Sequence, residues 1–485
     1  MRTRRIELKC FLAWKGWPLL VITAAAFSLR LFHMGQQGAW DNEAFSITTS
    51  TVPMDKLTSA LIDDFVNPPL HYYLLHAWFA LCGSGTYQAR LLSVLFGTLS
   101  IPTIYLLARH LYGRSVALLA SALMGISELG VTYSQEARSY AMFLFLALCT
   151  AYLFLKSLEG DGRPARLGFL ISAVALLYTH YYGIFVLLAL TSYALLFRRS
   201  LVPGAVRRIL MTLALALGLL IPWLASGVIG KALSSPKTAP GTQPPWFEVK
   251  ASTLLKTLNH FNNGDMRGPI DSAPHWTFVL GALLFTAPAG MALWRARRAA
   301  TCQQTSFVLL LCLPLPIIVA LSGAFALQYG IRYVSFCTGF YYILVARGVL
   351  QLRRAFSAAL IVLILAYSAP ALQALYSTPY KENYRDALRD LSAQWRAGDC
   401  AVFWPFEKIP LQWWIDSRGK QPPLNAIKLQ AAASKESGCR RVWLVTYRRL
   451  ESPTTEAAAE ALNKHFRRSA RQSYFWITLD LYTTE

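Results

Sequence analysis

Two acidic residues stand in a short polar stretch that directly follows the first apolar run of the chain. The stretch reads GQQGAWDNEAFSITTS, residues 35–50, and places Asp41 and Glu43 two positions apart between Trp40 and Phe45. A carboxylate can accept a proton from an incoming hydroxyl group, as a general base does. Acids this close to an apolar segment are either solvated loop charges or reacting groups at a bilayer surface.

The composition of the chain indicates a polytopic membrane protein. Of its 485 residues, 55% are hydrophobic and only 15% are charged, and the mean hydropathy is +0.37. Soluble globular proteins carry about 25% charged residues. The net charge of +22 would suggest a nucleic-acid partner if the basic residues shared one surface, but they come in short clusters between apolar runs. We therefore expect membrane lipid, and no nucleic acid, as a partner.

The order of apolar runs and basic gaps predicts how the chain crosses the membrane. About eleven runs are candidate spans, at roughly 17–33, 89–108, 115–131, 139–155, 166–182, 183–197, 209–225, 276–294, 304–322, 334–347 and 355–371. Basic clusters fall in alternate gaps, at 108–114, 156–166, 197–208, 294–298 and 346–354. The positive-inside rule then predicts a cytoplasmic N-terminus, with the remaining gaps and the C-terminus outside.

Segment 68–83 does not fit this count. It is apolar enough to insert, yet a span there would reverse every later loop. We expect a re-entrant or interfacial helix, with the alternative that one short neighbouring run does not cross.

The predicted domains are a transmembrane module, residues 1–371, and a polar extracytoplasmic domain, residues 372–485. The module includes a first exterior loop at 34–88 and a long exterior loop at 226–275. This second loop is expected to hold a short amphipathic helix near 247–261 and to act as a lid or as a plain connector.

The extracytoplasmic domain has the pattern of a small α/β fold. YKENYRDALRDLSAQWRAGDCAVFWP predicts an amphipathic helix and then a strand, and RRVWLVTYRR and SYFWITLDLYT predict further strands. Cys400 and Cys439 each precede a predicted strand, which makes them the candidates for a disulfide in an oxidising exterior compartment.

Further polar side chains share the predicted exterior side with the two acids. They are Asp63, Asp64, Asn67, His71, Arg90, Glu136, Arg138, His180, Arg332 and Tyr333. Ionisable groups cost about 2.5–3.5 kcal/mol each at the centre of a membrane helix, so they mark a site unless they reach water at the helix end. Arginine forks suit a phosphate leaving group, and no Gly-rich phosphate loop is present. These residue types predict transfer from a lipid-linked phosphate to a hydroxyl.

Aromatic residues accompany this set. They are Trp40, Tyr72, Tyr73, Tyr181 and Tyr182. Such side chains suit a membrane interface and can also stack on sugar rings.

Several of these segments, in this order, resemble the GT-C glycosyltransferases. The segments are WDNEAFS, NPPLHYYLLHAWFALCGSGTYQARLLSVLFGTLSIPTIYLLARHLYG, YSQEARSYAMFLFL, THYYGIF, IRYVSF and YKENYRDALRDL. The branch they resemble most includes the protein O-mannosyltransferases and the aminoarabinose and galacturonic acid transferases of lipid A. The resemblance implies an all-α polytopic membrane fold with a small C-terminal α/β domain, in a bacterial cytoplasmic (inner) membrane.

The resemblance also implies a reaction. Such enzymes take a sugar from a polyprenyl phosphate with inversion and pass it to a hydroxyl of a glycan, a lipid or a protein. Asp41 is the favoured base and Glu43 its partner in orienting a substrate. The usual acidic pair of this branch is adjacent, whereas Asn42 separates the two acids here, so Glu43 as the base is the alternative.

Other motif residues take expected roles from the same resemblance. Donor phosphate contacts are expected from Arg90, Arg138, Arg332 and Tyr333, and substrate contacts from Asn67, His71, Glu136, His180 and Tyr181. Packing of His71 and a salt bridge of Glu136 are the structural alternatives. Some members of the class use a divalent cation, but no HxxH or HExxH pattern occurs, so no metal ligand is assigned.

Two other functions compete with glycosyl transfer. A transporter or flippase for a lipid-linked sugar would place ionisable groups at mid-membrane depth, whereas the predicted spans are nearly free of charge. A non-catalytic scaffold would tolerate changes at Arg90 and Arg138. The enzyme hypothesis requires that the acids and the arginines meet at the exterior lipid boundary.

Overall fold

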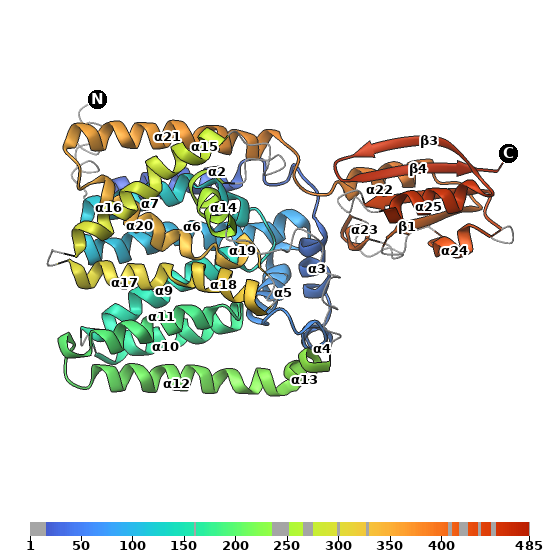
Figure 1. Cartoon of the computed structure of the whole chain (residues 1–485). Helices are drawn as coiled ribbons and strands as arrows, with labels where there is room; N and C mark the ends of the chain where they lie inside the picture. The colour runs from blue at the N-terminus through green and yellow to red at the C-terminus, as the bar shows by residue number, and fades with distance from the viewer. Residues whose placement is uncertain are drawn as a thin grey trace, which may run out of the picture. The chain divides into compact units, whose positions relative to one another are not determined.

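The computed structural model of the chain forms two compact units (Figure 1). It describes residues 16–159, 162–234, 252–264, 275–297, 301–325, 329–405, 410–416, 425–434, 438–447 and 453–484. The first, which we call the helical unit, consists of Met1–Phe32, Pro53–Leu74 and Arg90–Ser377. The second, which we call the loop–sheet unit, consists of His33–Val52, Leu75–Ala89 and Thr378–Glu485.

Helices make up most of the first 377 residues. They are α2 (Trp17–Leu31), α3 (Asp41–Ser50), α4 (Met54–Asp64), α5 (Leu70–Cys82), α6 (Thr86–Tyr112), α7 (Arg114–Ile126), α8 (Glu128–Ser134), α9 (Tyr140–Leu158), α10 (Gly162–Thr179), α11 (Gly183–Leu196), α12 (Ala205–Trp223), α13 (Ile229–Ser234), α14 (Ser252–Asn263), α15 (His275–Gly281), α16 (Ala287–Ala296), α17 (Cys302–Cys312), α18 (Pro314–Phe325), α19 (Ile331–Val334), α20 (Cys337–Val349) and α21 (Arg354–Ser377). Short π-helical turns, Leu224–Val228 and Ala282–Thr286, continue α12 into α13 and α15 into α16.

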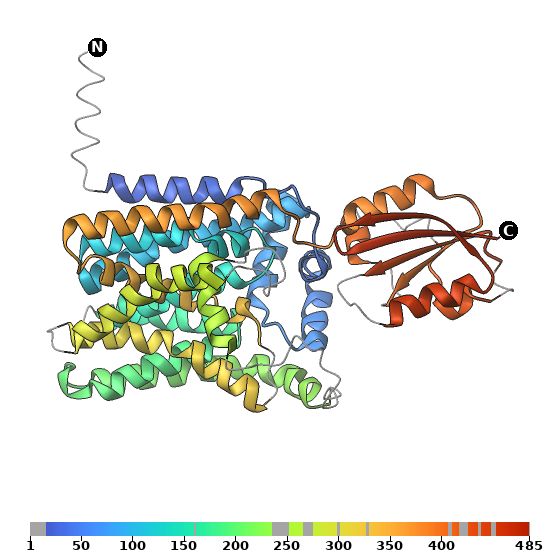
Figure 2. The same cartoon turned by 45° about the horizontal axis from the view of Figure 1, so that its top comes forward.

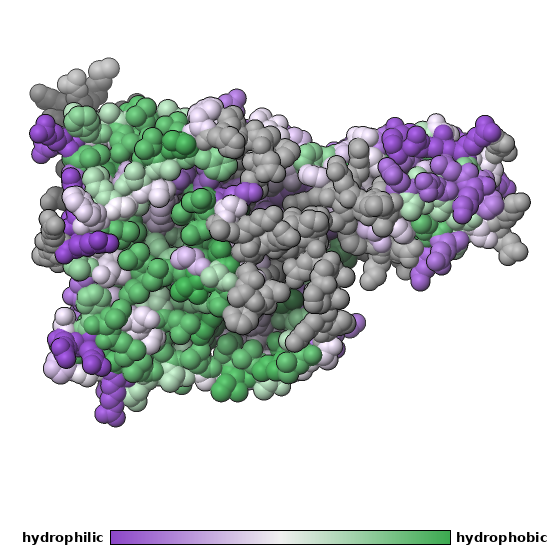
Figure 3. All heavy atoms as spheres, in the orientation of Figure 1, coloured by the Kyte–Doolittle hydropathy of each residue, from purple (hydrophilic) through white to green (hydrophobic). Residues whose placement is uncertain are grey.

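The helical unit is built around α20. This helix is apolar on nearly every side, all but one of its residues are buried, and it packs against α7, α16 and α17. The outer helices α12 and α21 instead expose large apolar side chains such as Met211, Ile221 and Phe356. Figure 3 shows broad hydrophobic areas over the helical unit. Exposed apolar surface of this extent suits contact with lipid, as expected for a multi-pass membrane protein.

Within the described part of the chain, six helices are long and apolar enough to cross a membrane. They are Thr86–Tyr112, Tyr140–Leu158, Ala205–Ser234, Trp276–Ala296, Cys302–Ser322 and Arg354–Ser377. A seventh span results if α7 and α8, which meet at a bend of 60°, count as one. The count of about eleven stays a prediction. Helix α5 has 13 residues, fewer than the roughly 20 of an untilted span.

Several predicted cytoplasmic gaps lie together. The Arg347 guanidinium is 5.2 Å from the centre of the Tyr112 ring, and Arg295 donates to the carbonyl of Gln351 at 2.8 Å. His110 lies 3.0 Å from Glu159. These contacts join gaps 108–114, 156–166, 294–298 and 346–354, as the alternation of basic clusters requires. The side of the membrane on which they lie stays a prediction.

The long exterior loop contributes a helix that docks on the bundle. Tyr342 donates its hydroxyl to the carbonyl of Phe261 at 2.6 Å, and Tyr341 donates to Asn262 Oδ1 at 2.7 Å. The helix predicted near 247–261 is thus α14, displaced by a few residues toward the C-terminus. Residues 235–251 and 265–274 of this loop, and with them the predicted lid, lie outside the described residues.

The C-terminal part is a four-stranded sheet with helices on both faces (Figure 2). Its elements are α22 (Tyr384–Gln394), β1 (Asp399–Trp404), α23 (Leu411–Asp416), α24 (Leu429–Ala432), β2 (Arg441–Tyr447), α25 (Pro453–Asn463), β3 (Arg467–Tyr474) and β4 (Ile477–Thr483). The strand order is β1-β2-β4-β3, with β1 parallel to β2 and the other pairs antiparallel. This agrees with the predicted small α/β domain.

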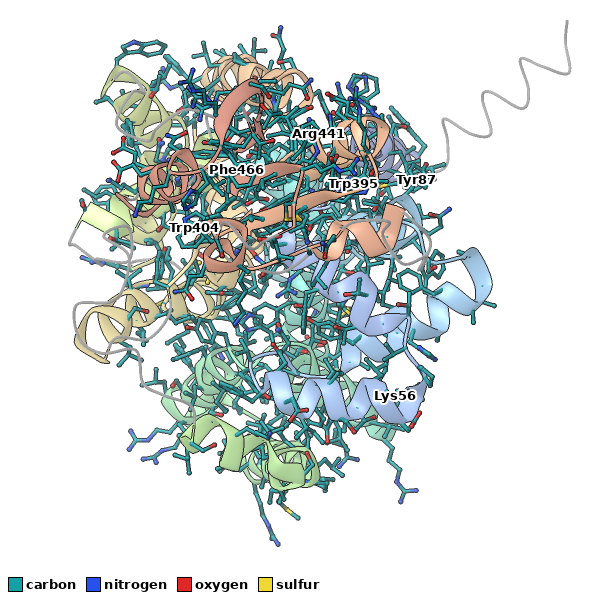
Figure 4. All side chains as sticks on the ribbon, turned by 90° about the vertical axis from the view of Figure 1, so that its right-hand side faces the viewer. Lys56, Tyr87, Trp395, Trp404, Arg441 and Phe466 are labelled. Carbon is teal, nitrogen blue, oxygen red and sulfur yellow. A yellow bond between two sulfur atoms is a disulfide. The ribbon has the colours of Figure 1, made fainter. Side chains whose placement is uncertain are left out.

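Alternating side chains of the strands build two cores. On β2, Trp443 and Val445 pack toward α22, while Val442 and Leu444 pack toward α24 and α25. Arg441 at the start of β2 donates from Nε to Asp399 Oδ1 of β1 at 2.8 Å (Figure 4).

A disulfide joins the two cysteines of this domain. It links Cys400 on β1 to Cys439 just before β2, with 5.7 Å between the Cα atoms, and both side chains are buried in the core on the α24–α25 side. The neighbouring starts of β1 and β2 bring the two residues together, because β1 and β2 pair in parallel with Cys400 opposite Val442.

Candidate active site

Both acids of the first exterior loop lie in the first turn of α3. Trp40 is the extended N-cap residue, and Asp41 and Glu43 follow within the first turn. Carboxylates are favoured at this end of a helix because the unpaired backbone N–H groups give it a partial positive charge. The local sequence therefore explains why α3 begins here, and the environments of the two carboxylates then differ.

Glu43 is a fully buried partner of a lysine. Its Oε2 atom lies 2.9 Å from the Nζ atom of Lys381, and the two side chains are 0% and 3% exposed. The backbone before the lysine is held as well, because Gln37 Oε1 accepts hydrogen bonds from the N–H groups of Tyr380 and Lys381, each at 3.0 Å. Glu43 is thus a counter-ion inside the loop–sheet unit, with no exposed surface to meet a substrate.

Asp41 is partly exposed and carries no such ion pair among the contacts described. Its Oδ1 atom accepts a hydrogen bond from Gln412 Nε2 of α23 at 2.8 Å. Burial raises the pKa of Asp41 above its ordinary value, and the bond from Gln412, which favours the charged form, partly opposes this rise. Burial and then the charge of Asp41 also raise the pKa of the neighbouring Tyr384. A raised pKa makes the Asp41 carboxylate a stronger base than an ordinary aspartate.

Lys381→Met should destabilise the protein by about 3–5 kcal/mol, because it leaves the Glu43 carboxylate buried without a counter-ion. A Glu43→Leu/Lys381→Leu double variant should recover most of that loss, since it removes both charges. Lys231→Met is the matched control. Lys231 pairs with Asp63 at 2.8 Å, but both side chains are more than half exposed, so the effect should stay below about 1 kcal/mol.

Thermal unfolding of the purified protein in detergent, followed by tryptophan fluorescence, measures these differences. Equal Tm values for the Lys381→Met and Lys231→Met variants would show that the buried Glu43–Lys381 pair stabilises the protein no more than an exposed pair does.

In the helical unit, the side chain of one arginine is oriented by hydrogen bonds to two side-chain oxygens. Arg138, in the turn before α9, donates from Nη1 to the hydroxyl of Tyr72 at 3.1 Å and from Nη2 to Asn67 Oδ1 at 3.2 Å. Asp64 Oδ2 in turn accepts from the backbone and side-chain nitrogens of Asn67, at 3.1 and 2.8 Å. The guanidinium also lies 5.8 Å from the centre of the Tyr140 ring. These contacts fix the plane of the fork, and the residue is buried.

Arg332 lies in the same neighbourhood. It donates from Nη2 to the hydroxyl of Tyr333 at 3.2 Å, and the Tyr333 ring is 6.3 Å from that of Tyr140. The His180 ring lies 5.6 Å from the Tyr333 ring and stacks on Phe143 at 4.8 Å.

His180 itself lies in the turn between α10 and α11. The guanidinium groups of Arg138 and Arg332 are the cations of this neighbourhood, which we call the arginine–tyrosine cluster (Arg138, Arg332, Tyr72, Tyr140, Tyr333).

The remaining predicted residues of the helical unit are described by their burial and by their nearest contacts. Arg90 in α6 and His71 in α5 are each 1% exposed, and His71 lies edge-on to the Tyr72 ring at 5.6 Å. Glu136 is 5% exposed, and its carbonyl accepts from the N–H of Arg138. Tyr181 accepts a hydrogen bond from Trp223 Nε1 at 3.1 Å.

Comparison with known proteins gives both a family match and a fold. Residues 66–225 match the family described as dolichyl-phosphate-mannose-protein mannosyltransferase. ArnT from Cupriavidus metallidurans in the apo state superposes with a TM-score of 0.62 at 14% identity, covering 97% of this chain and 98% of ArnT. The chain has a GT-C fold. The predicted resemblance to this superfamily is thereby confirmed.

Two further solved structures share this fold. ArnT from Cupriavidus metallidurans bound to undecaprenyl phosphate gives a TM-score of 0.59 at 14% identity, with 96% of this chain and 98% of ArnT covered. The archaeal oligosaccharyltransferase AglB from Archaeoglobus fulgidus, in complex with an inhibitory peptide and a dolichol-phosphate, gives 0.53 at 12% identity, covering 97% and 74%. No curated protein sequence matches the chain.

The structure adds site residues that the sequence motifs did not single out. Lys381 and Gln412, which contact the two acids, come from the C-terminal part. The Tyr140 ring lies near both the Arg138 guanidinium and the Tyr333 ring. Lys381 could have been noticed in the sequence, because it is the only lysine of the segment YKENYRDALRDL and a lysine can pair with an acid. Nothing in the sequence around Gln412 marks its contact.

No group of three or more His, Cys, Asp or Glu side chains is arranged to hold a metal ion in the part of the chain that the structure describes. The Asp64 carboxylate accepts hydrogen bonds from Asn67.

Proposed function

We propose that the protein is an inverting glycosyltransferase of the outer face of the cytoplasmic membrane. It moves a sugar from a polyprenyl-phosphate donor to a hydroxyl of an acceptor, with Asp41 as the general base and Arg138 and Arg332 on the donor phosphate. The arginine–tyrosine cluster is the observation that carries this proposal, because it orients two guanidinium groups on the fold of an enzyme solved with undecaprenyl phosphate.

The reaction follows from these groups. Asp41 takes the proton of the acceptor hydroxyl while the hydroxyl oxygen forms a bond to the anomeric carbon on the face opposite the phosphate. The bond between that carbon and the phosphate oxygen breaks, and the polyprenyl phosphate leaves with the electron pair. Guanidinium groups cannot lose their charge, so they stabilise the phosphate as its negative charge increases. Attack from the opposite face inverts the anomeric centre.

The contrast between the two acids supports Asp41 as the base. Glu43 is 0% exposed and paired with Lys381, whereas Asp41 is partly exposed and has a raised pKa. In related enzymes the two acids are adjacent, whereas Asn42 separates them here, and the different roles of the two acids account for this spacing. The first acid reacts, and the second fixes α3 to the segment that contains Lys381.

Purified full-length protein in nanodiscs should consume a polyprenyl-phosphate sugar and release polyprenyl phosphate when an acceptor fraction from the cell envelope is added. Mass spectrometry of the lipid measures the release, and the NMR coupling constant of the product's anomeric proton reports the configuration. Retention of configuration would contradict the single displacement. Consumption of a nucleotide sugar without any lipid donor would contradict the donor class.

A further inference from the structure

The loop–sheet unit contains a large cavity that the proposed chemistry does not use. Its volume is about 1040 Å³, and every residue that lines it belongs to this unit. Three parts of the chain form the wall: the loop before α3 together with the C-terminal half of α3, the turn 83–88 before and at the start of α6, and the helices α22 and α23. Small-molecule sites measure about 300–1,000 Å³, so this cavity can hold an extended ligand of several rings.

The lining mixes polar and apolar groups and is nearly uncharged. Its polar residues include Thr48, Thr51, Ser84 and Gln88, and no Asp, Glu, Lys or His lines it among the residues that the structure describes. Among the described lining residues the single cation is Arg385, which donates to the carbonyl oxygens of Gly35 and Gln36 and so holds α22 to the loop before α3. A ligand here meets hydrogen-bonding groups and one guanidinium, whose Nη atoms already donate to backbone carbonyl oxygens.

An aromatic side chain completes the lining. Tyr87 is 48% exposed at the start of α6, where Figure 4 labels it. A half-exposed tyrosine offers a rigid apolar face and a polar tip, which suits the apolar face of a sugar ring and its hydroxyl groups. Gly83 leaves open space beside it, since a Cβ atom there would meet nothing within 4 Å.

Two wall segments of the cavity lie close in sequence to the proposed base and to its hydrogen-bond partner. Leu411 and Ile415 line it from α23, and Gln412, which lies between them in sequence, donates to Asp41. Gly38, three residues before Asp41, lines the same cavity. Asp41 and Gln412 are not themselves lining residues, so a ligand must extend past this wall to reach the carboxylate.

We propose that this cavity is a subsite for a neutral saccharide, and that it holds the sugar chain of the acceptor so that one hydroxyl reaches Asp41. The role as an acceptor site rests on the proposed function. Binding of a neutral saccharide does not, because it requires neither the donor nor turnover.

Saturation-transfer NMR tests the binding on full-length Asp41→Asn protein in detergent, with no lipid donor present, so that the ligand is not consumed. The probes are maltose and cellobiose as neutral saccharides, glucose 6-phosphate as an anionic sugar, and a Ser/Thr-containing hexapeptide. We expect saturable transfer to the neutral saccharides, with at least tenfold weaker binding of the anionic sugar and of the peptide. Absence of saturable binding of both neutral probes up to 50-fold molar excess would overturn the proposal, as would preferred binding of the peptide.

Two variants locate the binding. Thr48→Trp fills the cavity and Tyr87→Ala removes its aromatic face, so each should weaken saccharide binding at least tenfold. Ser59→Trp is the matched control, because Ser59 is exposed on α4 and does not line the cavity. Equal binding in Tyr87→Ala, Thr48→Trp and Ser59→Trp would place the saccharide elsewhere. Positive binding without glycosyl transfer would retain the subsite and reject the proposed reaction.

Discussion

Replacing Asp41 with asparagine should lower the rate of sugar transfer by about 10²–10⁴-fold, the factor that a positioned general base contributes. Asparagine keeps the shape of the side chain, and its carbonyl oxygen can still accept the hydrogen bond from Gln412, but it takes no proton. We expect the loss in kcat, with KM for the donor nearly unchanged, because the donor phosphate is proposed to bind elsewhere. Release of polyprenyl phosphate from the lipid donor measures the rate.

The pH dependence separates a chemical role of Asp41 from a structural one. A base must be deprotonated, so kcat/KM should fall as the pH drops through the pKa of Asp41, which burial places above the ordinary value of a carboxyl. The bond from Gln412 lowers that pKa, so Gln412→Leu should move the acidic limb of the profile to higher pH. An acidic limb that stays in place in Gln412→Leu would assign it to another group.

Glu43→Gln is the matched control for Asp41→Asn. It removes the buried partner of Lys381, so its main effect should be a lower Tm rather than a changed pH profile. If Glu43→Gln instead lost as much kcat as Asp41→Asn at an unchanged Tm, Glu43 would be the base and the assignment of the two acids would be reversed.

The acidic pair illustrates how far the sequence could lead. Residue types and the position after the first apolar run were enough to single out Asp41 and Glu43. The choice between them depended on burial and on Lys381, whose pairing with Glu43 spans 338 positions of the chain. Local patterns carry no information on a contact of that range, because it is set by how the C-terminal segment folds back on α3.

The sheet also contains an element, β3, that local sequence patterns do not predict. Strands β2 and β4 were predicted because their buried side chains form apolar runs. Strand β3 has the sequence RRSARQSY and only its last residue, Tyr474, is partly buried, so it gives no apolar or alternating pattern. An edge strand of charged residues forms because its neighbour β4 offers backbone partners, and its charges protect the free edge.

The arginines were predicted by type, and their surroundings were only partly predictable. Arg138 is predicted to contact the donor phosphate and Asn67 a substrate, and the structure joins the two by a hydrogen bond. Tyr140 has no predicted role, because its position at the start of a long apolar helix resembles that of any packing residue. Whether the acids of the loop–sheet unit and these arginines meet around one donor stays a prediction.

Arg138→Gln should lower kcat/KM for the lipid donor by about 10²–10³-fold, the usual effect of removing one donor that stabilises a developing negative charge. Tyr72 and Asn67 accept hydrogen bonds from its Nη atoms, so the substitution removes a guanidinium whose orientation these contacts fix. Arg109→Gln is the matched control, because Arg109 also lies over a tyrosine ring, that of Tyr105 at 5.9 Å, but is exposed on α6. We expect its rate to equal that of the unmodified protein.

Arg138→Lys and a double variant decide what the arginine does. Lysine keeps the charge but lacks the planar fork, so Arg138→Lys should recover only part of the lost rate if the phosphate is held by two parallel bonds. Groups that serve one step give losses that do not add. Asp41→Asn/Arg138→Gln should therefore be clearly faster than the product of the two single losses predicts. Fully additive losses would mean that the base and the guanidinium act in separate events, and the proposal of one shared reaction would fail.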